Sequence, residues 1–375
     1  MVERTLKKHL SEKLFQRKTI VLTGARQVGK TTLIRDVLDG KDFLFLDGDD
    51  PLVRQRLTNP NTIEIGTILG NAEIVFIDEA QRIENIGLTA KIIHDQFPRV
   101  QLIMSGSSAF ELRNRTNEPL TGRKFEYFLF PVSYEEHEES VGYLDAMRDL
   151  ENRLIYGFYP DVINQRGNER EILNGLVESY LFKDILSFAN IQKPEVLQKI
   201  LRALAFQVGS EVSYNEIAQL TGVDKNTVSN YIYLLELSHI VYPITSFSRN
   251  LRNEIKTNRK IYFYDNGIRN AIIQNFNPIN LRNDVGPLWE NFLMTERRKR
   301  NHYHQKYCSG YFWRTKQQQE IDYVEEADGQ ITGFEFKWNP KAKSKIPAAF
   351  VKTYKAEVEV ITKENFRDFV CSKCS

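Results

Sequence analysis

The residues from Gly24 to Thr32 have the types and spacing of a loop that holds phosphates. The stretch GARQVGKTT fits the pattern G-x-x-x-x-G-K-T, with Lys30 and Thr31 after its second glycine. Glycines let backbone N–H groups turn toward phosphate oxygens, and a following helix directs its positive end at them. Lys30 can reach the β and γ phosphates, and the Thr31 hydroxyl can bind Mg²⁺. The predicted ATP-binding residues are Gly24, Ala25, Arg26, Gln27, Val28, Gly29, Lys30, Thr31 and Thr32.

Two more segments carry candidate residues for the same chemistry. The apolar segment AEIVFIDEAQ ends in Asp78, which suits Mg²⁺ coordination, and Glu79, which can orient and polarise the attacking water. The same two acids would also suit the beginning of a helix, since acids favour that end. The segment QLIMSGSSAFEL ends in a small polar run that includes Ser107. Because open α/β sheets bind ligands at the carboxyl ends of their strands, Ser107 is a further candidate for nucleotide contact.

Near the other end of the chain, the stretch IDYVEEADGQITGFEFKW predicts a hairpin with charged residues on one face. Its DG dipeptide at 328–329 is a strong signal for a two-residue turn. That turn sets Asp322 opposite Glu335 and Glu320 opposite Lys337, all on one side of an amphipathic hairpin. The opposite, core side consists of Ile321, Tyr323, Phe334, Phe336 and Trp338.

Two carboxylates that face each other across a hairpin repel unless a cation neutralises them. Mg²⁺ prefers oxygen ligands, so Asp322 and Glu335 are candidate metal ligands. Lys337 is a candidate catalytic residue that would neutralise charge on a phosphate or help to activate water. A solvated strand face is commonly charged as well, in which case Glu320 and Lys337 simply form a pair.

The elements that must position the first site form a parallel sheet. The segment 19–38 predicts a strand, a loop and a helix, and four further apolar segments predict strands within 43–47, 72–81, 101–112 and 126–130. Alternating strands and helices of this kind favour one doubly wound parallel α/β sheet of ordinary domain size.

The middle of the chain is predicted to be helical. Apolar residues recur at helical spacing from 133 to 193, which indicates a helical lid or connector. The segment 211–241 then predicts a helix-turn-helix: Ser213 caps the first helix, Gly222 makes the turn and Asp224 caps the second helix.

The second of these helices begins with polar residues that can contact phosphates or base edges, and the basic segment 248–260 after it predicts a wing. Together they favour double-stranded DNA as a partner. Winged helices also serve as lids and as protein–protein modules, so an assembly switch without DNA contact is the alternative. The polar residues at the start of the helix are Lys225, Asn226, Thr227 and Asn230.

Composition limits the possible classes of protein. A chain of 375 residues with 27% charged residues suggests two or three packed domains. The net charge is only +2, yet residues 249–314 contain 13 Lys and Arg against 5 Asp and Glu, which predicts a polyanionic partner for that segment. Three cysteines and no bilayer-length apolar run favour the cytoplasm. Zinc ligand types occur in HYHQKYC and CSKC, but with one C-x-x-C pair only.

Taken together, the motifs GARQVGKTT, DEAQ, SGSSAFEL and LTGRKFEYFLFPVSYEE resemble those of a prokaryotic AAA-type ATPase family with a C-terminal domain of unknown function. The resemblance implies that Arg123, in the LTGR motif, lies close to the nucleotide as a phosphate sensor or arginine finger. Arg115 is the competing candidate, and a surface ion pair is the alternative for Arg123.

The C-terminal hairpin resembles the PD-(D/E)xK nuclease superfamily, with Asp322 on one strand and Glu335-x-Lys337 on the next. That resemblance implies a further acidic metal ligand on the helix predicted over 288–300, where Glu290 is the first choice and Glu296 the alternate. It leaves open whether the domain cuts nucleic acid.

The complete prediction is an α/β protein in which a P-loop sheet is followed by a helical and winged-helix region and a restriction-endonuclease-like domain. Its function is ATP binding and hydrolysis coupled to DNA engagement, with Glu79, Arg123 and Lys337 as catalytic candidates and homo-oligomerisation left open. The predicted domains are an ATPase core at 1–132, a helical connector at 133–193, a winged helix at 194–260 and a nuclease-like domain at 261–375.

Overall fold

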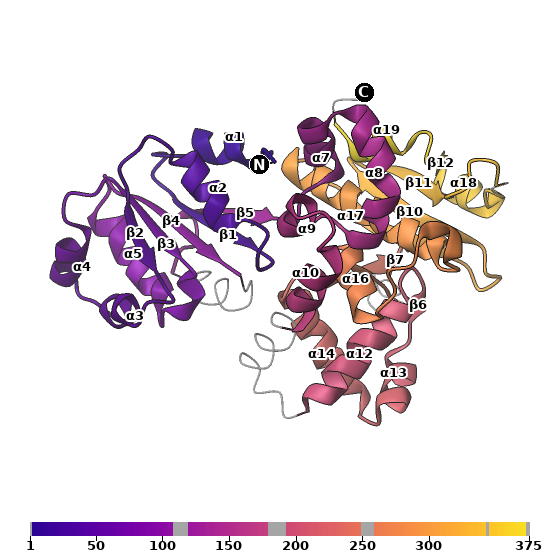
Figure 1. Ribbon diagram of the computed structural model, residues 1–375, viewed down its shortest axis with the longest axis horizontal. Helices are drawn as coiled ribbons and strands as arrows, with labels where there is room; N and C mark the ends of the chain where they lie inside the picture. The colour runs from indigo at the N-terminus through magenta and orange to yellow at the C-terminus, as the bar shows by residue number, and fades with distance from the viewer. Residues whose placement is uncertain (1, 108–118, 179–192, 249–258, 343–344, 373–375) are drawn as a thin grey trace. The chain divides into compact units, whose positions relative to one another are not determined.

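The computed structural model describes residues 2–107, 119–178, 193–248, 259–342 and 345–372 (Figure 1). The chain forms two compact units. The N-terminal unit comprises Val2–Pro131 and Leu237–His239, and the C-terminal unit comprises Val132–Glu236 and Ile240–Ser375. No helix within the described ranges has the length and apolar character needed to cross a membrane.

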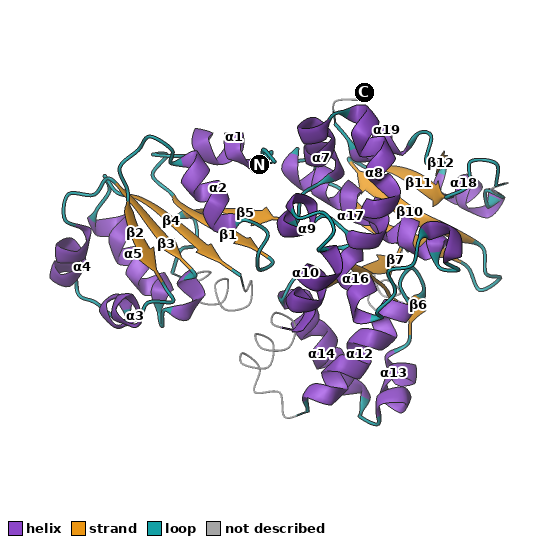
Figure 2. Ribbon diagram, viewed as in Figure 1, coloured by secondary structure: helices purple, strands orange, loops and turns teal. Residues whose placement is uncertain are grey.

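The N-terminal unit is built on a five-stranded parallel sheet with the order β2-β3-β4-β1-β5 (Figure 2). The central strands β1, β3 and β4 are buried at every residue, as expected for a sheet that is covered on both faces. All five predicted strands are confirmed. Their bounds are β1 Thr19–Gly24, β2 Leu44–Asp47, β3 Ile74–Asp78, β4 Gln101–Gly106 and β5 Lys124–Leu129.

Helices connect and cover these strands. One hydrophobic cluster joins Ile65 and Leu69 of α4 and Ile93 of α5 to Val75 and Ile77 of β3. This packing stabilises the face of the sheet away from the P-loop helix α2. The helices of the unit are α1 Leu6–Glu12, α2 Lys30–Val37, α3 Pro51–Leu57, α4 Thr62–Leu69 and α5 Ile86–Gln96, with a 3₁₀ turn, η1, at Ala80–Arg82.

The C-terminal unit combines helices with a seven-stranded mixed sheet of order β12-β11-β10-β9-β7-β8-β6. The expected domain border at 260/261 falls inside β8, so one continuous sheet runs across it. The strands are β6 Glu211–Val212, β7 Val241–Ser246, β8 Arg259–Phe263, β9 Ser309–Arg314, β10 Glu320–Ala327, β11 Gln330–Phe336 and β12 Glu357–Ile361. The helices are α7 Tyr134–Val141, α8 Tyr143–Tyr156, α9 Pro160–Asn164, α10 Glu169–Leu176, α12 Pro194–Phe206, α13 Tyr214–Thr221, α14 Lys225–Leu237, α16 Asn266–Ile272, α17 Val285–Tyr303, α18 Ala348–Tyr354 and α19 Phe366–Val370, with a 3₁₀ turn, η3, at Ile279–Leu281.

The predicted helix-turn-helix is confirmed as local structure in α13 and α14. The Ser213 hydroxyl accepts a hydrogen bond from the Glu216 backbone N–H at 3.3 Å, and Gly222 ends α13 with a φ of 70°. The Asp224 carboxylate accepts hydrogen bonds from the Thr227 backbone N–H (3.0 Å) and hydroxyl (2.6 Å) at the start of α14. Most of the predicted wing, residues 249–258, lies outside the described residues.

The register predicted for the C-terminal hairpin is confirmed: Ala327 pairs with Gln330 and Tyr323 with Phe334. The prediction that one face of the hairpin is charged and the other apolar is wrong, because buried apolar residues lie on both faces, whereas the charged side chains Glu320, Asp322, Glu335 and Lys337 are only partly buried. Pairing of β10 with β9 is irregular between Ile321 and Val324, and this irregularity brings both side chains into one cluster with Phe350 of α18. Phe334 packs instead against Phe369 of α19, with ring centroids 4.8 Å apart.

Candidate active site

The phosphate-binding loop connects the carboxyl end of β1 to α2. Gly29 has a φ of 92°, in the region that favours glycine, and immediately precedes the first residue of the helix. A Cβ atom at Gly24 would overlap the carbonyl oxygen of Leu129 on the neighbouring strand β5. Both glycines are therefore required by the backbone, and the loop leads directly into a helix N-terminus that can bind an anion.

Lys30 lies over this loop with its ammonium group buried. Its Nζ donates hydrogen bonds to the carbonyl oxygens of Gly24 at 3.1 Å and Ala25 at 2.8 Å. Burial lowers the pKa of Lys30 to about 8, although the carboxylates of Glu79 and Asp78 act in the opposite direction. Burial therefore makes the charged form of Lys30 unfavourable at this position, and the ammonium lies beside the loop where it can donate to a phosphate.

Asp78, at the carboxyl end of β3, faces the first turn of α2. Its carboxylate accepts a hydrogen bond from the Thr31 hydroxyl at 2.6 Å and another from the Ser105 hydroxyl of β4. A hydroxyl and a buried carboxylate brought together beside a phosphate-binding loop are the oxygen donors that Mg²⁺ uses with nucleotides. Thr31 and Asp78 therefore fit the metal that the P-loop implies.

Glu79 follows in a left-handed conformation, with a φ of 46°. Its carboxylate accepts hydrogen bonds from the Gln81 amide and from the Ser107 hydroxyl, the latter at 3.2 Å. The Gln81 amide also donates to the Ser107 oxygen at 3.0 Å. Three polar side chains, Glu79 directly after β3, Gln81 of η1 and Ser107 directly after β4, thus form one group. This group would orient the carboxylate that is predicted to activate water.

Two residues of this site escaped the sequence analysis. Gln81 is 1% exposed and holds Glu79, a role that its place in the DEAQ motif could have suggested. Arg4 donates hydrogen bonds to the carbonyl oxygens of Val28, in the loop, at 2.9 Å and Phe130 at 2.6 Å. Because Arg4 is 24 residues from Val28, no local pattern indicates that it supports the loop.

Arg123 is not near the P-loop of its own chain. It immediately precedes β5, where its backbone oxygen accepts from the Thr19 N–H at the first residue of β1. Gly24 lies at the other end of β1, which is roughly 17 Å away at about 3.3 Å per residue. Arg123 forms a partly exposed ion pair with Asp95 at 3.0 Å, as in the alternative interpretation. The prediction that Arg123 senses phosphate within its own chain is therefore wrong. The competing candidate, Arg115, lies outside the described residues.

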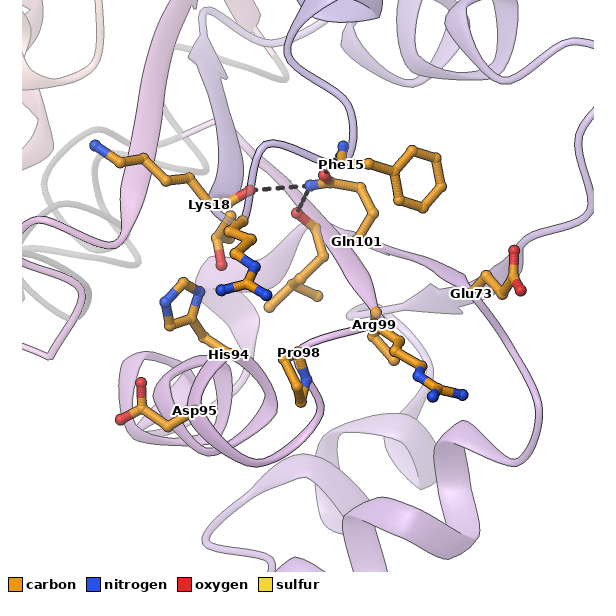
Figure 3. A pocket seen from close by; sticks show the side chains of 12 residues that line it. Phe15, Lys18, Glu73, His94, Asp95, Pro98, Arg99 and Gln101 are labelled. Atoms are coloured by element: carbon orange, nitrogen blue, oxygen red, sulfur yellow. Dashed lines mark hydrogen bonds between the residues drawn. The ribbon is translucent and has the colours of Figure 1, made fainter.

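The edge of the sheet near Arg123 also has a cavity of about 510 Å³ (Figure 3). Gln101 lines this cavity, and its side-chain amide donates hydrogen bonds to the Lys18 and Leu102 carbonyl oxygens at 3.0 and 2.9 Å. His94 and Arg99 also line it. Since the cavity lies where β1 and β4 begin, it is separate from the loop at their carboxyl ends.

In the C-terminal unit, the start of α14 presents a polar surface. Lys225, Asn226, Ser229 and Asn230 are exposed, whereas Val228 is fully buried in the unit. The helix therefore has the division of faces that the sequence predicted, with groups able to donate to phosphates or base edges on its outer side.

The basic segment 249–314 is largely an internal feature where it is described. Five of its cations are at most 9% exposed, and several of these pair with carboxylates that are buried or partly buried. The prediction that the whole segment binds a polyanion is therefore wrong, because many of its positive charges are buried and paired with carboxylates. These five cations are Lys260, Arg269, Arg282, Lys299 and Arg300.

Lys260 of β8 lies among carboxylates from two other elements. Its Nζ is 3.0 Å from Glu290 Oε1 of α17 and 2.5 Å from Glu320 Oε1 of β10. Burial alone would lower the pKa of Lys260, but Glu290, Glu320 and Asp322 outweigh it and raise the pKa. Burial raises the pKa of Glu290 to about 7, while Lys260 opposes that rise. Tyr262 also donates to Glu290 Oε1, at 2.6 Å.

The remaining residues of the predicted nuclease-like site have partners as well. Asp322 accepts a hydrogen bond from the Phe336 backbone N–H at 2.8 Å, and Lys337 donates to Glu335 Oε1 at 2.7 Å. Burial raises the pKa of both carboxyls, and their mutual repulsion raises that of Glu335 further. Within the described ranges, no group of three or more His, Cys, Asp or Glu could hold a metal ion. The arrangement of Glu290, Asp322 and Glu335 around one metal is therefore not assembled here.

The alternate acid Glu296 is also engaged, on the same helix α17. It forms a buried ion pair with Lys299 at 2.6 Å and accepts from the Tyr134 backbone N–H at 2.6 Å. Among the described candidates for zinc ligands, His304 pairs with Glu135 at 3.0 Å, and Cys371 is buried and forms no disulfide.

Comparison with family models gives three matches along the chain. Residues 16–138 match the model of the AAA domain, residues 147–279 match a domain of unknown function (DUF8612), and residues 285–371 match another (DUF4143). The match to the AAA domain over residues 16–138 agrees with the P-loop site and supports ATP binding and hydrolysis by this chain.

The similar proteins include two that are described as uncharacterised. An uncharacterised protein of Mycobacterium tuberculosis is 26% identical over 335 residues, which cover 88% of this chain and 72% of that protein. Another from Haemophilus influenzae is 26% identical over 278 residues, or 68% of each chain. Among solved structures, a Walker-type ATPase of Pyrococcus abyssi is 15% identical, with a TM-score of 0.49 over 73% of this chain and 96% of that chain.

Proposed function

We propose that this chain hydrolyses ATP at the P-loop and couples its nucleotide state to the engagement of double-stranded DNA through α13 and α14. The observation that carries the ATPase part is the assembly of Lys30, Thr31, Asp78 and Glu79 at one edge of the parallel sheet. The DNA part is supported by the capped, outward-facing polar start of α14.

In the ATPase reaction, the chain's own groups have separate tasks. Lys30 leaves the carbonyl oxygens of Gly24 and Ala25 to donate to phosphate oxygens. Thr31 and Asp78 would hold Mg²⁺, which neutralises developing charge on the phosphates. Glu79, oriented by Gln81 and Ser107, accepts the proton of the attacking water. Arg123 is remote from the loop of its own chain, so a role as an arginine finger would require a second copy of the chain.

The decisive experiment measures ATP turnover with and without duplex DNA, together with binding of a labelled duplex across a salt series. If α14 and the segment after it neutralise phosphates, log affinity falls steeply with log salt. Lys225→Ala should weaken binding and reduce that slope by about one, and the Arg249, Arg252 and Lys256→Ala triple variant by up to about three.

Lys352→Ala is the matched control, because this exposed lysine lies on α18, outside the proposed DNA-binding surface. It should keep both the affinity and the slope of the natural chain. Unchanged binding in the Lys225 and triple variants would remove DNA from the proposal and leave the ATPase untouched.

A second candidate function is a nucleotide-controlled protein-assembly switch. Large apolar side chains are exposed on three helices of the same region: Phe206 (61%), Leu220 (65%) and Tyr233 (54%). Exposed apolar groups of this size suit a protein partner better than a duplex. ATPase activity that is indifferent to DNA, with no salt-dependent duplex binding, favours this candidate.

We do not propose DNA cleavage. One oxygen of each of the carboxylates Glu290, Asp322 and Glu335 accepts from Lys260, the Phe336 N–H or Lys337, and Glu335 Oε2 is buried without a hydrogen-bond partner in the described part of the chain. Among the residues that the structure describes, however, no group of three or more His, Cys, Asp or Glu could hold a metal ion.

A further inference from the structure

The end of strand β5 contacts the phosphate-binding loop at two points. The carbonyl oxygen of Leu129, the last residue of β5, lies so close to Gly24 that a Cβ atom there would overlap it. Arg4 makes the second link, because its guanidinium donates to the carbonyl oxygens of Val28 in the loop (2.9 Å) and of Phe130 directly after β5 (2.6 Å). Arg4 is only 9% exposed, so these hydrogen bonds are largely shielded from water. One buried side chain thus joins the loop to the end of β5.

The peptide group between Val28 and Gly29 connects Arg4 to the other side of the loop. This peptide is trans and planar, so its N–H points in the direction opposite to its C=O. Since the Val28 C=O accepts from Arg4, the Gly29 N–H is directed away from Arg4. A cation at the oxygen also polarises the peptide and makes its N–H a stronger donor. Arg4 is therefore placed to orient and polarise one backbone donor of the phosphate-binding loop.

The same strand also contacts the residues that follow α14. Leu237, the last residue of α14, and His239 belong to the N-terminal unit, whereas the rest of α14 belongs to the C-terminal unit. His239 has a φ of 57° and is 7% exposed, and the centroid of its ring lies 4.4 Å from that of Phe128 in β5. The Phe128 ring lies 4.5 Å from the ring of Phe130, whose carbonyl oxygen accepts from Arg4. A series of direct contacts thus leads from the loop to the end of α14.

We propose that Arg4 positions the Val28–Gly29 peptide for a nucleotide phosphate and couples the occupied loop to α14 through the end of β5. The inference rests on the proposed nucleotide binding and adds the route by which it reaches α14. A phosphate that accepts from the Gly29 N–H strengthens the hydrogen bond at the other end of the same peptide, because hydrogen bonds in a chain polarise one another. Arg4 then holds Phe130 more firmly, and the turn at His239 opens less often. Because coupling is reciprocal, Arg4 in turn strengthens the binding of the phosphate.

Calorimetry on the full chain tests the positioning role, with Mg²⁺, without DNA, and with adenylyl imidodiphosphate, an ATP analogue that is not hydrolysed. Arg4→Met should bind the analogue roughly tenfold more weakly than the natural chain, as expected for the loss of one charge-assisted hydrogen bond. Arg4→Lys keeps a cation but not the two-nitrogen fork, so its affinity should lie between the two. Arg99→Met is the matched control and should bind as the natural chain does, because Arg99 is an exposed arginine of the same unit beside the cavity where β1 and β4 begin.

Hydrogen exchange followed by mass spectrometry tests the coupling, at an analogue concentration that saturates each protein. In the natural chain and in Arg99→Met, the analogue should slow exchange at residues 232–240 by about fivefold or more, the lower end of ordinary coupling energies. Arg4→Met and Phe128→Leu should show no such slowing, although Phe128→Leu keeps Arg4 and should bind the analogue normally. A merely structural defect would change exchange with and without the analogue alike and would leave the difference between the two in place.

Two outcomes would overturn the inference. The first is natural affinity for the analogue in Arg4→Met, or in Arg4→Lys where Arg4→Met does not fold. The second is an effect of the analogue on residues 232–240 that is the same in Phe128→Leu as in the natural chain, whether it is a slowing or no change. Both measurements use an analogue that is not hydrolysed and no DNA, so a failure of ATP turnover or of DNA binding is distinguished from a failure of this inference.

Discussion

Lys30 should make the nucleotide-free ATPase unit less stable at neutral pH, although the same residue is required for ATP binding. Its pKa falls from 10.5 to about 8, mainly through burial. At 1.36 kcal/mol per pKa unit this corresponds to a cost on the order of 3 kcal/mol. Lys30→Met removes that cost, but it also removes the donor to two carbonyl oxygens, at about 1 kcal/mol each. We expect a net gain of about 1 kcal/mol in the unfolding free energy of the nucleotide-free unit at pH 7.

The difference in unfolding free energy between Lys30→Met and the natural chain should change sign as the pH rises. A lysine whose pKa is lowered by folding binds its proton more tightly in the unfolded chain, so stability rises with pH between about 8 and 10.5. Near pH 10.5 the native chain has lost the cost of the buried charge and keeps the two hydrogen bonds. Lys30→Met should then be the less stable protein, by about 2 kcal/mol.

Urea unfolding followed by far-ultraviolet circular dichroism measures this difference, with tryptophan fluorescence marking the separate transition of the C-terminal unit. Lys8→Met is the control, because Lys8 is an exposed lysine on α1 of the same unit and its replacement should not give a pH-dependent difference. ATP should stabilise the natural chain and not Lys30→Met. A stability difference between the natural chain and Lys30→Met that does not change between pH 7 and 10.5 would refute the reasoning.

Three further predictions concern single substitutions. Glu79→Gln should bind ATP and fail to turn it over, because Thr31 and Asp78 survive; equal turnover would remove Glu79 from the mechanism. Hydrogen bonds from His304 and Ser372 outweigh burial and lower the pKa of Glu135 to about 2, so its stabilising effect is present above pH 4.5 and is lost as pH falls toward 2. Glu135→Gln should therefore destabilise the C-terminal unit at pH 6, and about 2 kcal/mol of that difference should disappear by pH 3 in urea titrations; a constant difference would contradict this account. Gly157→Ala, at a φ of 71° and with a Cβ that would overlap the Asp265 carboxylate, should lower the Tm of the same unit markedly, and a neutral effect would show that the loop can move.

Much of the ATPase unit could be predicted because its signals are local. The loop motif lies within one strand–turn–helix segment, and Asp78 ends a strand whose apolar run identifies it. The hairpin register likewise follows from one dipeptide turn, and the structure keeps it from Ala327 to Tyr323. Each of these features depends on residues close together in the chain.

The errors arose where distant residues decide the outcome. The alternation rule assigned Ile321 to the same face as Tyr323, but an irregular pairing with β9 moved it to the other face. The LTGR motif predicts that Arg123 lies near the nucleotide, but its position directly before β5 places it at the edge of the sheet where β1 begins. Neither strand irregularity nor strand order can be read from local spacing.

Counting charges along the sequence also failed, and this failure affects how the C-terminal unit should be tested. A carboxylate such as Glu290 resembles a metal ligand in the sequence, because its ion-pair partner Lys260 is 30 residues away and the pair cannot be recognised from spacing. Replacing Glu290 alone leaves a buried ammonium with fewer partners, which is strongly destabilising whatever the residue's function. Loss of any activity in Glu290→Ala could therefore result from loss of the folded structure and would not show that Glu290 takes part in a reaction. Only a double-mutant cycle that also removes Lys260 separates the two, because it restores the charge balance while the ligand stays absent.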